Sequence, residues 1–157
     1  GITRDEYDKE LYLFAGKMAI KNSLPEEAEA FLRQAIALDP EYMEAVLTLV
    51  SMLSNDERDE ELIEIVEGLH TIDFEWSTLS TFAAAAYDRL EDYEKAGKHY
   101  ANAYQDHDDD ALFLEKYVYF LLEDGQHDKA KEVAKKLNAL QPEEQEWLDL
   151  LTRFDEQ

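Results

Sequence analysis

One apolar pattern recurs every 34 residues along this chain. Ala28, Leu62, Ala96 and Ala130 hold the same place in successive copies, with no insertion between them. A fixed period of this length is typical of a solenoid, in which each unit buries its apolar face only against its neighbours. The period therefore restricts the chain to a stack of similar units.

Turn signals divide these units into helices. Asp39-Pro40 ends one apolar stripe, Asn55-Asp56 interrupts another, and Gly125 marks a later turn. Because helices joined by about two to four residues cannot reach any other arrangement, each pair is expected to lie antiparallel. The pattern predicts helices at about 3–22, 23–38, 41–54, 59–71, 75–90, 92–105, 111–123, 126–140 and 143–154.

These helices predict one all-α domain over residues 1–157. We expect a right-handed α-solenoid of four helix-turn-helix repeats plus a C-terminal capping helix, which can turn its polar side to water. The repeats are expected at 9–42, 43–76, 77–110 and 111–144, and the cap at 143–155.

The charge balance excludes several classes of partner. The chain carries 38 acidic and 15 basic residues, a net charge of −23, whereas nucleic acid and anionic membrane surfaces attract clustered Lys and Arg. The excess of acid serves either solubility or the recruitment of basic partners.

Composition also bears on location and redox chemistry. There is no cysteine, so disulfides, thiolate metal sites and cysteine nucleophiles are excluded. No apolar run is long enough to span a membrane. We expect a cytoplasmic protein, and the start at Gly1 without Met leaves open that the chain is cut from a longer one.

The motifs of catalysis and cofactor binding do not occur in the sequence. The glycines are scattered singly, and the four histidines fall in different repeats. The acidic run from Asp106 to Asp110 lacks the central Gly and closing Glu of a calcium loop. We interpret Asp108 to Asp110 as capping the next helix. The sequence predicts a non-enzymatic protein with no cofactor and no metal site.

Three of the repeats match a known consensus. The matching residues are Tyr12, Ala15-Gly16, Ala28, Leu32, Ala35 and Pro40 in the first, Ala83-Ala84, Tyr87, Tyr93, Ala96, Tyr100 and Ala103 in the third, and Tyr117, Leu121, Gly125, Ala130, Leu137 and Pro142 in the fourth. On these residues the chain resembles the tetratricopeptide repeat (TPR) family from Lys9 to about Glu144. The second repeat departs from the pattern, with Leu62 where Ala is usual and Phe74 where Pro is usual.

The resemblance implies a concave binding groove lined by the first helix of each repeat. The partner-binding residues expected there are Leu13, Phe14, Lys17, Lys21, Leu47, Thr48, Ser51, Asn55, Thr81, Phe82, Arg89, Lys116 and Tyr119. Phe14, Phe82 and Tyr119 are candidate aromatic anchors. In an alternative interpretation, Phe14 and Phe82 simply pack between helices.

The predicted function is a protein-protein interaction scaffold. Its groove is expected to bind a peptide or helix of a partner protein, basic or amphipathic, with neither nucleic acid nor membrane as a partner. We expect a monomer or weak homodimer. Two alternatives stay open. The chain could be a self-associating structural module, in which Trp147, Leu150 and Phe154 dock onto another copy, or a regulatory TPR segment of a longer effector protein.

Overall fold

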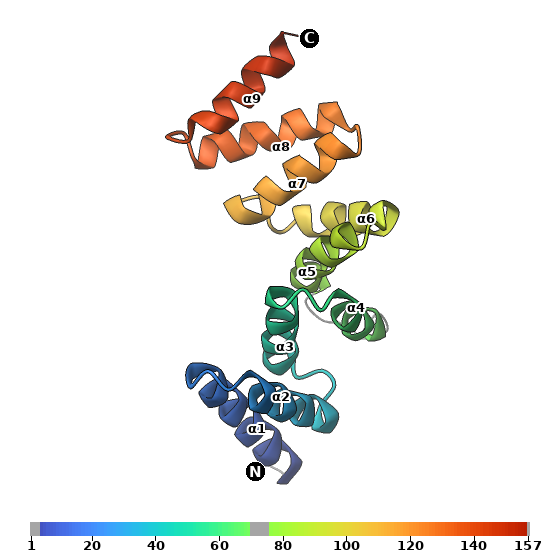
Figure 1. Ribbon diagram of the computed structural model, residues 1–157, viewed down its shortest axis with the longest axis vertical. Helices are drawn as coiled ribbons and strands as arrows, with labels where there is room; N and C mark the ends of the chain where they lie inside the picture. Colours follow the sequence, from blue (N-terminus) through green and yellow to red (C-terminus); the bar gives the residue numbers. More distant parts are fainter. Residues whose placement is uncertain (1–3, 70–75, 157) are drawn as a thin grey trace. The chain divides into compact units, whose positions relative to one another are not determined.

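The computed structural model describes residues 4–69 and 76–156, without the side chains of Asp5, Glu6 and Trp76. All regular structure in these ranges is helical (Figure 1). The helices are α1 (Arg4–Lys21), α2 (Pro25–Leu38), α3 (Met43–Asn55), α4 (Asp59–Gly68), α5 (Trp76–Arg89), α6 (Tyr93–Tyr104), α7 (Ala111–Glu123), α8 (His127–Leu140) and α9 (Gln145–Asp155). The predicted all-α repeat fold is confirmed.

The helix bounds agree with the predicted ones to within about two residues wherever the structure describes them. Ser23 does not begin the second helix, because Leu24 occupies the N-cap position and Pro25 is the first helical residue. The predicted ends at Thr3, Thr71 and Glu75, together with Phe74 and His70, lie outside the described residues.

The turn inside each hairpin has the same backbone shape in all four repeats. Ser23, Glu57, Glu91 and Gly125 stand 34 residues apart, and all four have positive φ, at 59°, 54°, 62° and 76°. This left-handed conformation is easy for glycine and uncommon for other residues. The next residue then donates its N–H to a carbonyl five positions back, as in Leu24 to Ala19 (2.9 Å), which satisfies the end of the first helix.

The chain divides into two compact units, residues 1–82 and 83–157, with the boundary inside α5. In the first unit α1 packs on α2, α2 on α3, and α3 on α4. The helices α1 and α2 approach closely at Gly16, where an added Cβ would lie 3.0 Å from Cγ of Leu32, a fully buried side chain. A side chain at residue 16 would therefore require the buried Leu32 side chain to shift.

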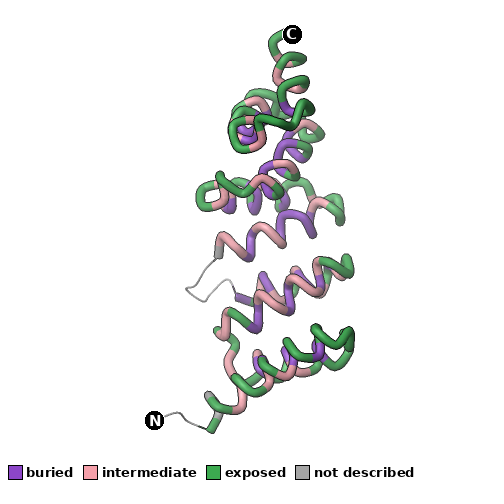
Figure 2. The backbone as a smooth tube through the Cα atoms, turned by 90° about the vertical axis from the view of Figure 1, so that its left-hand side faces the viewer, coloured by how far each residue is buried: buried purple, intermediate pink, exposed green. Residues whose placement is uncertain are grey.

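The repeat register predicted from the apolar pattern is confirmed by burial. Ala28, Leu62, Ala96 and Ala130 are each 0% exposed. Buried positions alternate with exposed ones along the helices of both units (Figure 2). Each helix thus buries one stripe against its neighbours, as the 3.6-residue period requires.

Aromatic side chains form the core of the second unit. Tyr100 on α6 lies 5.2 Å from Tyr117 and 4.9 Å from Phe120 of α7, measured between ring centroids. Tyr100 is 2% exposed and Phe120 is 1% exposed. Burial raises the pKa of Tyr100 well above its ordinary value and that of Tyr117 to about 12. Both rings therefore stay neutral at physiological pH.

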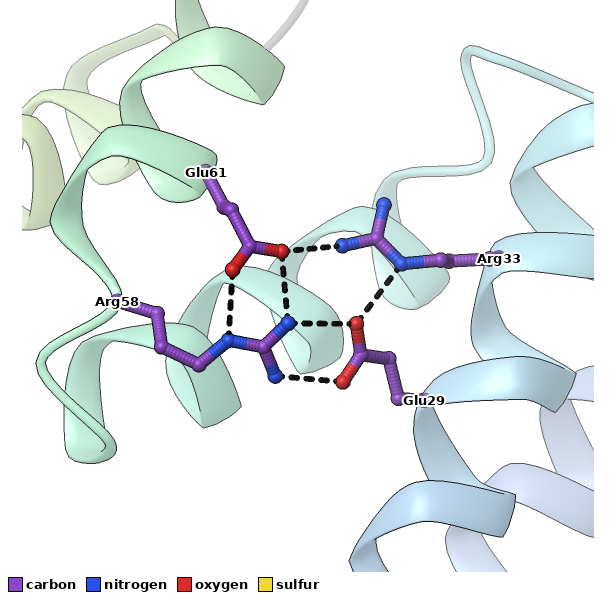
Figure 3. Close-up of polar contacts among 4 residues, drawn as sticks. All are labelled: Glu29, Arg33, Arg58 and Glu61. Atoms are coloured by element: carbon purple, nitrogen blue, oxygen red, sulfur yellow. Dashed lines mark hydrogen bonds and ion pairs between the residues drawn. The ribbon is translucent and has the colours of Figure 1, made fainter.

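An ion-pair cluster ties α2 to the start of α4 in the first unit (Figure 3). The Arg58 guanidinium donates to Glu29 at 2.6 and 3.0 Å and to Glu61 at 2.8 and 2.7 Å. Arg33 donates to the same two carboxylates. These hydrogen bonds from Arg58 lower the pKa of Glu29 and of Glu61 below their ordinary value of 4.5.

Replacing Arg58 should therefore destabilise the first unit in a pH-dependent way. In Arg58→Met, the two carboxylates lose the partner that depresses their pKa, so the melting temperature at pH 7 should fall. Because the folded pKa values are depressed, this stabilisation exists above the unfolded pKa and disappears as pH falls through the folded pKa. The thermal melts of the two proteins should approach each other as pH falls below about 4.3, the usual Glu pKa, and meet below the depressed pKa values of Glu29 and Glu61.

Arg4→Met is the matched control, because the Arg4 side chain is 93% exposed and pairs only loosely with Asp8 at 3.9 Å. Such surface pairs contribute little. An Arg58→Met melt that differs from wild type by the same amount at every pH would contradict the ion-pair argument.

Candidate partner-binding surfaces

In the first unit, most of the predicted partner-binding residues reach the surface. Phe14, Lys17 and Lys21 are exposed on α1, and Phe14 is 64% exposed. It therefore does not pack between helices of this unit. Leu13 differs from the expectation, since it is only 5% exposed and belongs to the core of the first hairpin. The other predicted residues of this unit are the partly exposed Leu47, Thr48, Ser51, Thr81 and Phe82 and the exposed Asn55.

Three of these polar residues already have partners within the unit. The Lys17 ammonium forms an ion pair with the Glu44 carboxylate of α3, which joins the exposed sides of α1 and α3. The Thr48 hydroxyl donates to the Glu44 carbonyl at 2.6 Å, and the Thr81 hydroxyl donates to the Thr78 carbonyl at 2.7 Å. Phe14 is the most exposed apolar residue of this set.

In the second unit, the predicted residues Arg89, Lys116 and Tyr119 are exposed, and Tyr119 faces α9. The Tyr119 hydroxyl donates to the Glu146 carboxylate, and its ring lies 6.1 Å from that of Trp147. The hydrogen bond to Glu146 raises the pKa of Tyr119 to about 12. Tyr119 therefore keeps its proton at neutral pH and remains 43% exposed.

Tyr119 stands at the edge of a cleft of about 590 Å³ between α7 and α9. Leu122, Trp147 and Leu150 contribute its apolar surface, and Glu146, Asp149 and Arg153 its charged groups. The α9 residues were predicted to belong to a cap rather than to a binding surface. The signal that could have revealed them is the repeat register, because residue 145 begins a fifth copy of the first-helix position.

Trp147 holds α9 in place. Its side chain is 2% exposed, and its Nε1 donates to Oε1 of Gln141 at 3.1 Å. The Lys131 ammonium also pairs with Asp155, 2.9 Å away, which joins the far end of α9 to α8. Trp147 thus packs almost entirely within this chain, and only its small exposed part lines the cleft, so it offers little surface for docking onto another copy.

The aspartates of the acidic run before α7 have different roles. Asp110 occupies the N-cap and accepts a hydrogen bond from the Phe113 N–H at 3.3 Å, as predicted. Asp108 instead pairs with Lys136 of α8 at 2.9 Å, and that contact lowers the pKa of Asp108. Among the residues that the structure describes, no group of three or more His, Asp or Glu side chains could hold a metal ion.

The described histidines are separated along the chain rather than gathered into one site. His99 is buried and stacks on Tyr87 with ring centroids 5.4 Å apart, whereas His107 lies 6.1 Å from Phe113. His127 begins α8 at the surface. In the ranges 4–69 and 76–156, no helix has the length and apolar character needed to cross a membrane.

The antiparallel hairpins, their 34-residue register and the surface cleft define a helical repeat protein. The chain belongs to the tetratricopeptide repeat family. Residues 79–144 match the family described as YpiA-like, C-terminal tetratricopeptide repeats. All 157 residues align at 34% identity with the TPR repeat-containing protein YpiA of Bacillus subtilis strain 168, and the chain spans 37% of that relative's length.

Solved structures show the same fold at lower sequence identity. MamA (residues 41 to the end) from Desulfovibrio magneticus RS-1 has a TM-score of 0.79 at 18% identity, covering 99% of this chain and 88% of MamA. YrrB, described as a TPR protein with an unusual peptide-binding site, has a TM-score of 0.75 at 16% identity, covering 94% of this chain and 79% of YrrB. TPR proteins in general are protein-interaction scaffolds.

Proposed function

We propose that this protein is a non-enzymatic scaffold that binds a peptide or helix of a partner protein on the exposed sides of its first helices. The cleft between α7 and α9 is the observation that carries the proposal. It combines an exposed aromatic side chain with apolar residues and a charged rim, the combination that gives peptide sites their affinity and orientation.

The charges of the cleft favour a basic or amphipathic segment. Glu146 and Asp149 outnumber Arg153 at its edge, and the chain as a whole carries −23. A segment with an apolar side chain for the surface of Leu122 and Leu150, flanked by Lys or Arg, would match both properties. Such complementarity mainly raises the association rate and selects against acidic partners. The peptide-binding site named for YrrB supports this use of the fold.

The groups in the cleft suit binding better than catalysis. Tyr119 keeps its proton at neutral pH because its hydroxyl donates to Glu146. Its ring is therefore available as a neutral contact surface and its hydroxyl as a donor, whereas a general base would need a pKa near the working pH.

We expect Tyr119→Ala to weaken peptide binding by about tenfold, because it removes an exposed aromatic contact of the kind that dominates interfaces. Peptides would first be selected on the 157-residue protein from a random displayed library. Their dissociation constants for each variant would then be measured by fluorescence anisotropy. The selected sequences should be enriched in Lys, Arg and large apolar residues.

Tyr93→Ala is the matched control, because Tyr93 is 46% exposed on α6 and lies outside the cleft. It should change the dissociation constant by less than about twofold. Equal binding to wild type and Tyr119→Ala, or selection of acidic peptides, would exclude the cleft as the binding surface. Circular dichroism of each variant shows whether the helices stay intact.

A further inference from the structure

The first helix carries an uncovered apolar stripe. Tyr7, Leu11, Phe14 and Met18 follow one another at spacings of three and four residues on α1, which places them on one side of the helix. They are 56%, 47%, 64% and 40% exposed. Single exposed apolar residues are common on protein surfaces, but a continuous stripe of four large ones marks an interaction surface.

The repeat register shows what this stripe corresponds to elsewhere in the chain. The positions equivalent to Leu11 include Ala45, Phe113 and Trp147, which are 0%, 5% and 2% exposed. Phe120 is equivalent to Met18 and is 1% exposed. The positions equivalent to Leu11 are thus buried in later repeats, and that of Met18 is buried at Phe120, whereas both are bare in α1. The positions equivalent to Phe14 stay partly or fully exposed, at Thr48, Phe82 and Lys116.

In later repeats this side is covered by the second helix of the preceding hairpin. Tyr100 of α6 packs on Phe120 and on Phe113, with ring centroids 4.9 and 5.9 Å apart. The residue that caps α8, Gln141, accepts the indole hydrogen bond of Trp147 at 3.1 Å. In the first unit, α2 packs on α3 in the same order. The covering group therefore comes from the hairpin before it in the chain.

We propose that the stripe on α1 is an inter-repeat interface, and that its occupant is the second helix of a further helical hairpin of the same polypeptide, N-terminal to Arg4. Two comparisons favour this source. The residues matched to a family, 79–144, are described as C-terminal repeats of YpiA-like proteins, and the chain spans 37% of YpiA.

A second copy of the chain is a poorer occupant. The sides of α2, α6 and α8 that could cover such a stripe already pack on α3, α7 and α9 of their own chain. A second copy could offer one of these sides to α1 only by opening that contact within its own chain. A hairpin of the same polypeptide has no such cost.

The test measures amide hydrogen exchange in two proteins, the 157-residue chain and the longer protein that its complete reading frame encodes. Amides of α1 should exchange roughly tenfold more slowly in the longer protein, because a covering hairpin suppresses local opening of the helix. In the longer protein, the double variant Leu11→Lys/Met18→Lys should abolish this slowing of amide exchange. In the 157-residue chain the same variant should leave the helicity unchanged.

Ile20→Lys serves as the control, because Ile20 is 40% exposed on α1 but lies outside the stripe. Three results would overturn the proposal: a reading frame that encodes no helical hairpin before Arg4, equal exchange of α1 in both proteins, or dimerisation of the longer protein that the double variant abolishes. The last result, seen by sedimentation, would assign the stripe to a second copy. Peptide binding at the α7–α9 cleft is measured separately and does not depend on any of these outcomes.

Discussion

Phe120→Ala should lower the free energy of unfolding by about 3–5 kcal/mol, the usual cost of truncating a fully buried aromatic side chain. For a protein of this size, that loss corresponds to a melting temperature lower by roughly 10 °C. Phe120 is 1% exposed and lies 4.9 Å from the ring of Tyr100, so it joins α7 to the preceding helix α6. Urea denaturation followed by circular dichroism measures the change directly.

Phe14→Ala provides the same chemical truncation at an exposed site. Phe14 is 64% exposed, so its removal should change the free energy of unfolding by no more than about 0.5 kcal/mol. Equal losses in Phe120→Ala and Phe14→Ala would show that the aromatic cluster of α6 and α7 is not the core of the second unit. A Tyr100→Phe variant separates the ring from its hydroxyl, which hydrogen-bonds Asp88, and should cost about 1 kcal/mol.

Trp147→Ala should release α9 and also cost about 3–5 kcal/mol. The indole is 2% exposed and is the largest buried side chain that α9 contributes. Because each repeat contacts only its neighbours, the loss should be local. Hydrogen exchange should show lost protection at Gln145–Asp155, with much smaller changes in α7 and the first turns of α8.

The Trp147→Ala variant should also bind selected peptides poorly, since Leu150 and Glu146 of the cleft are carried by α9. Leu148→Ala is the control on the same helix, because Leu148 is 48% exposed and outside the cleft. Retained protection of α9 in Trp147→Ala would mean that the ion pair between Lys131 and Asp155 and the remaining contacts suffice to hold the helix.

Much of the fold could be predicted because it depends on local spacing. The apolar residues of α7, such as Phe113, Tyr117 and Phe120, recur at helical intervals. This spacing predicts that one side of the helix is buried, whichever helix covers it. The N-cap at Asp110 is equally local, since its carboxylate accepts a hydrogen bond from Phe113, three residues later.

The candidate site was less accessible to prediction. Leu13 and Phe14 are adjacent apolar residues, yet one is 5% and the other 64% exposed. The exposure of these two residues differs because α2 packs against only one side of α1. Asp108 was expected to support the cap of α7 but pairs with Lys136, 28 residues away, because α8 returns antiparallel beside α7. Tyr119 was predicted to line the binding groove, whereas its partner Glu146 lies on a helix that was interpreted as a cap or as a docking surface for another copy.

The hairpin turns depend both on the local sequence and on the packing of the helices they connect. The 34-residue register predicts where each hairpin bends, and Gly125 is a local signal for a left-handed residue. Ser23, Glu57 and Glu91 adopt the same conformation without such a signal. A short connection between two antiparallel helices has only a few characteristic backbone conformations, and these three residues adopt the same one as Gly125.

The amino-acid sequence by itself determined the helices, their 34-residue register and the family to which the chain belongs, because hydrophobic spacing and helix ends act over a few residues. Only the tertiary structure decided which exposed faces remain available: the cleft between α7 and α9, and the bare stripe on α1. Exposure depends on which neighbouring helix covers a side chain, and that neighbour lies a whole repeat away in the sequence.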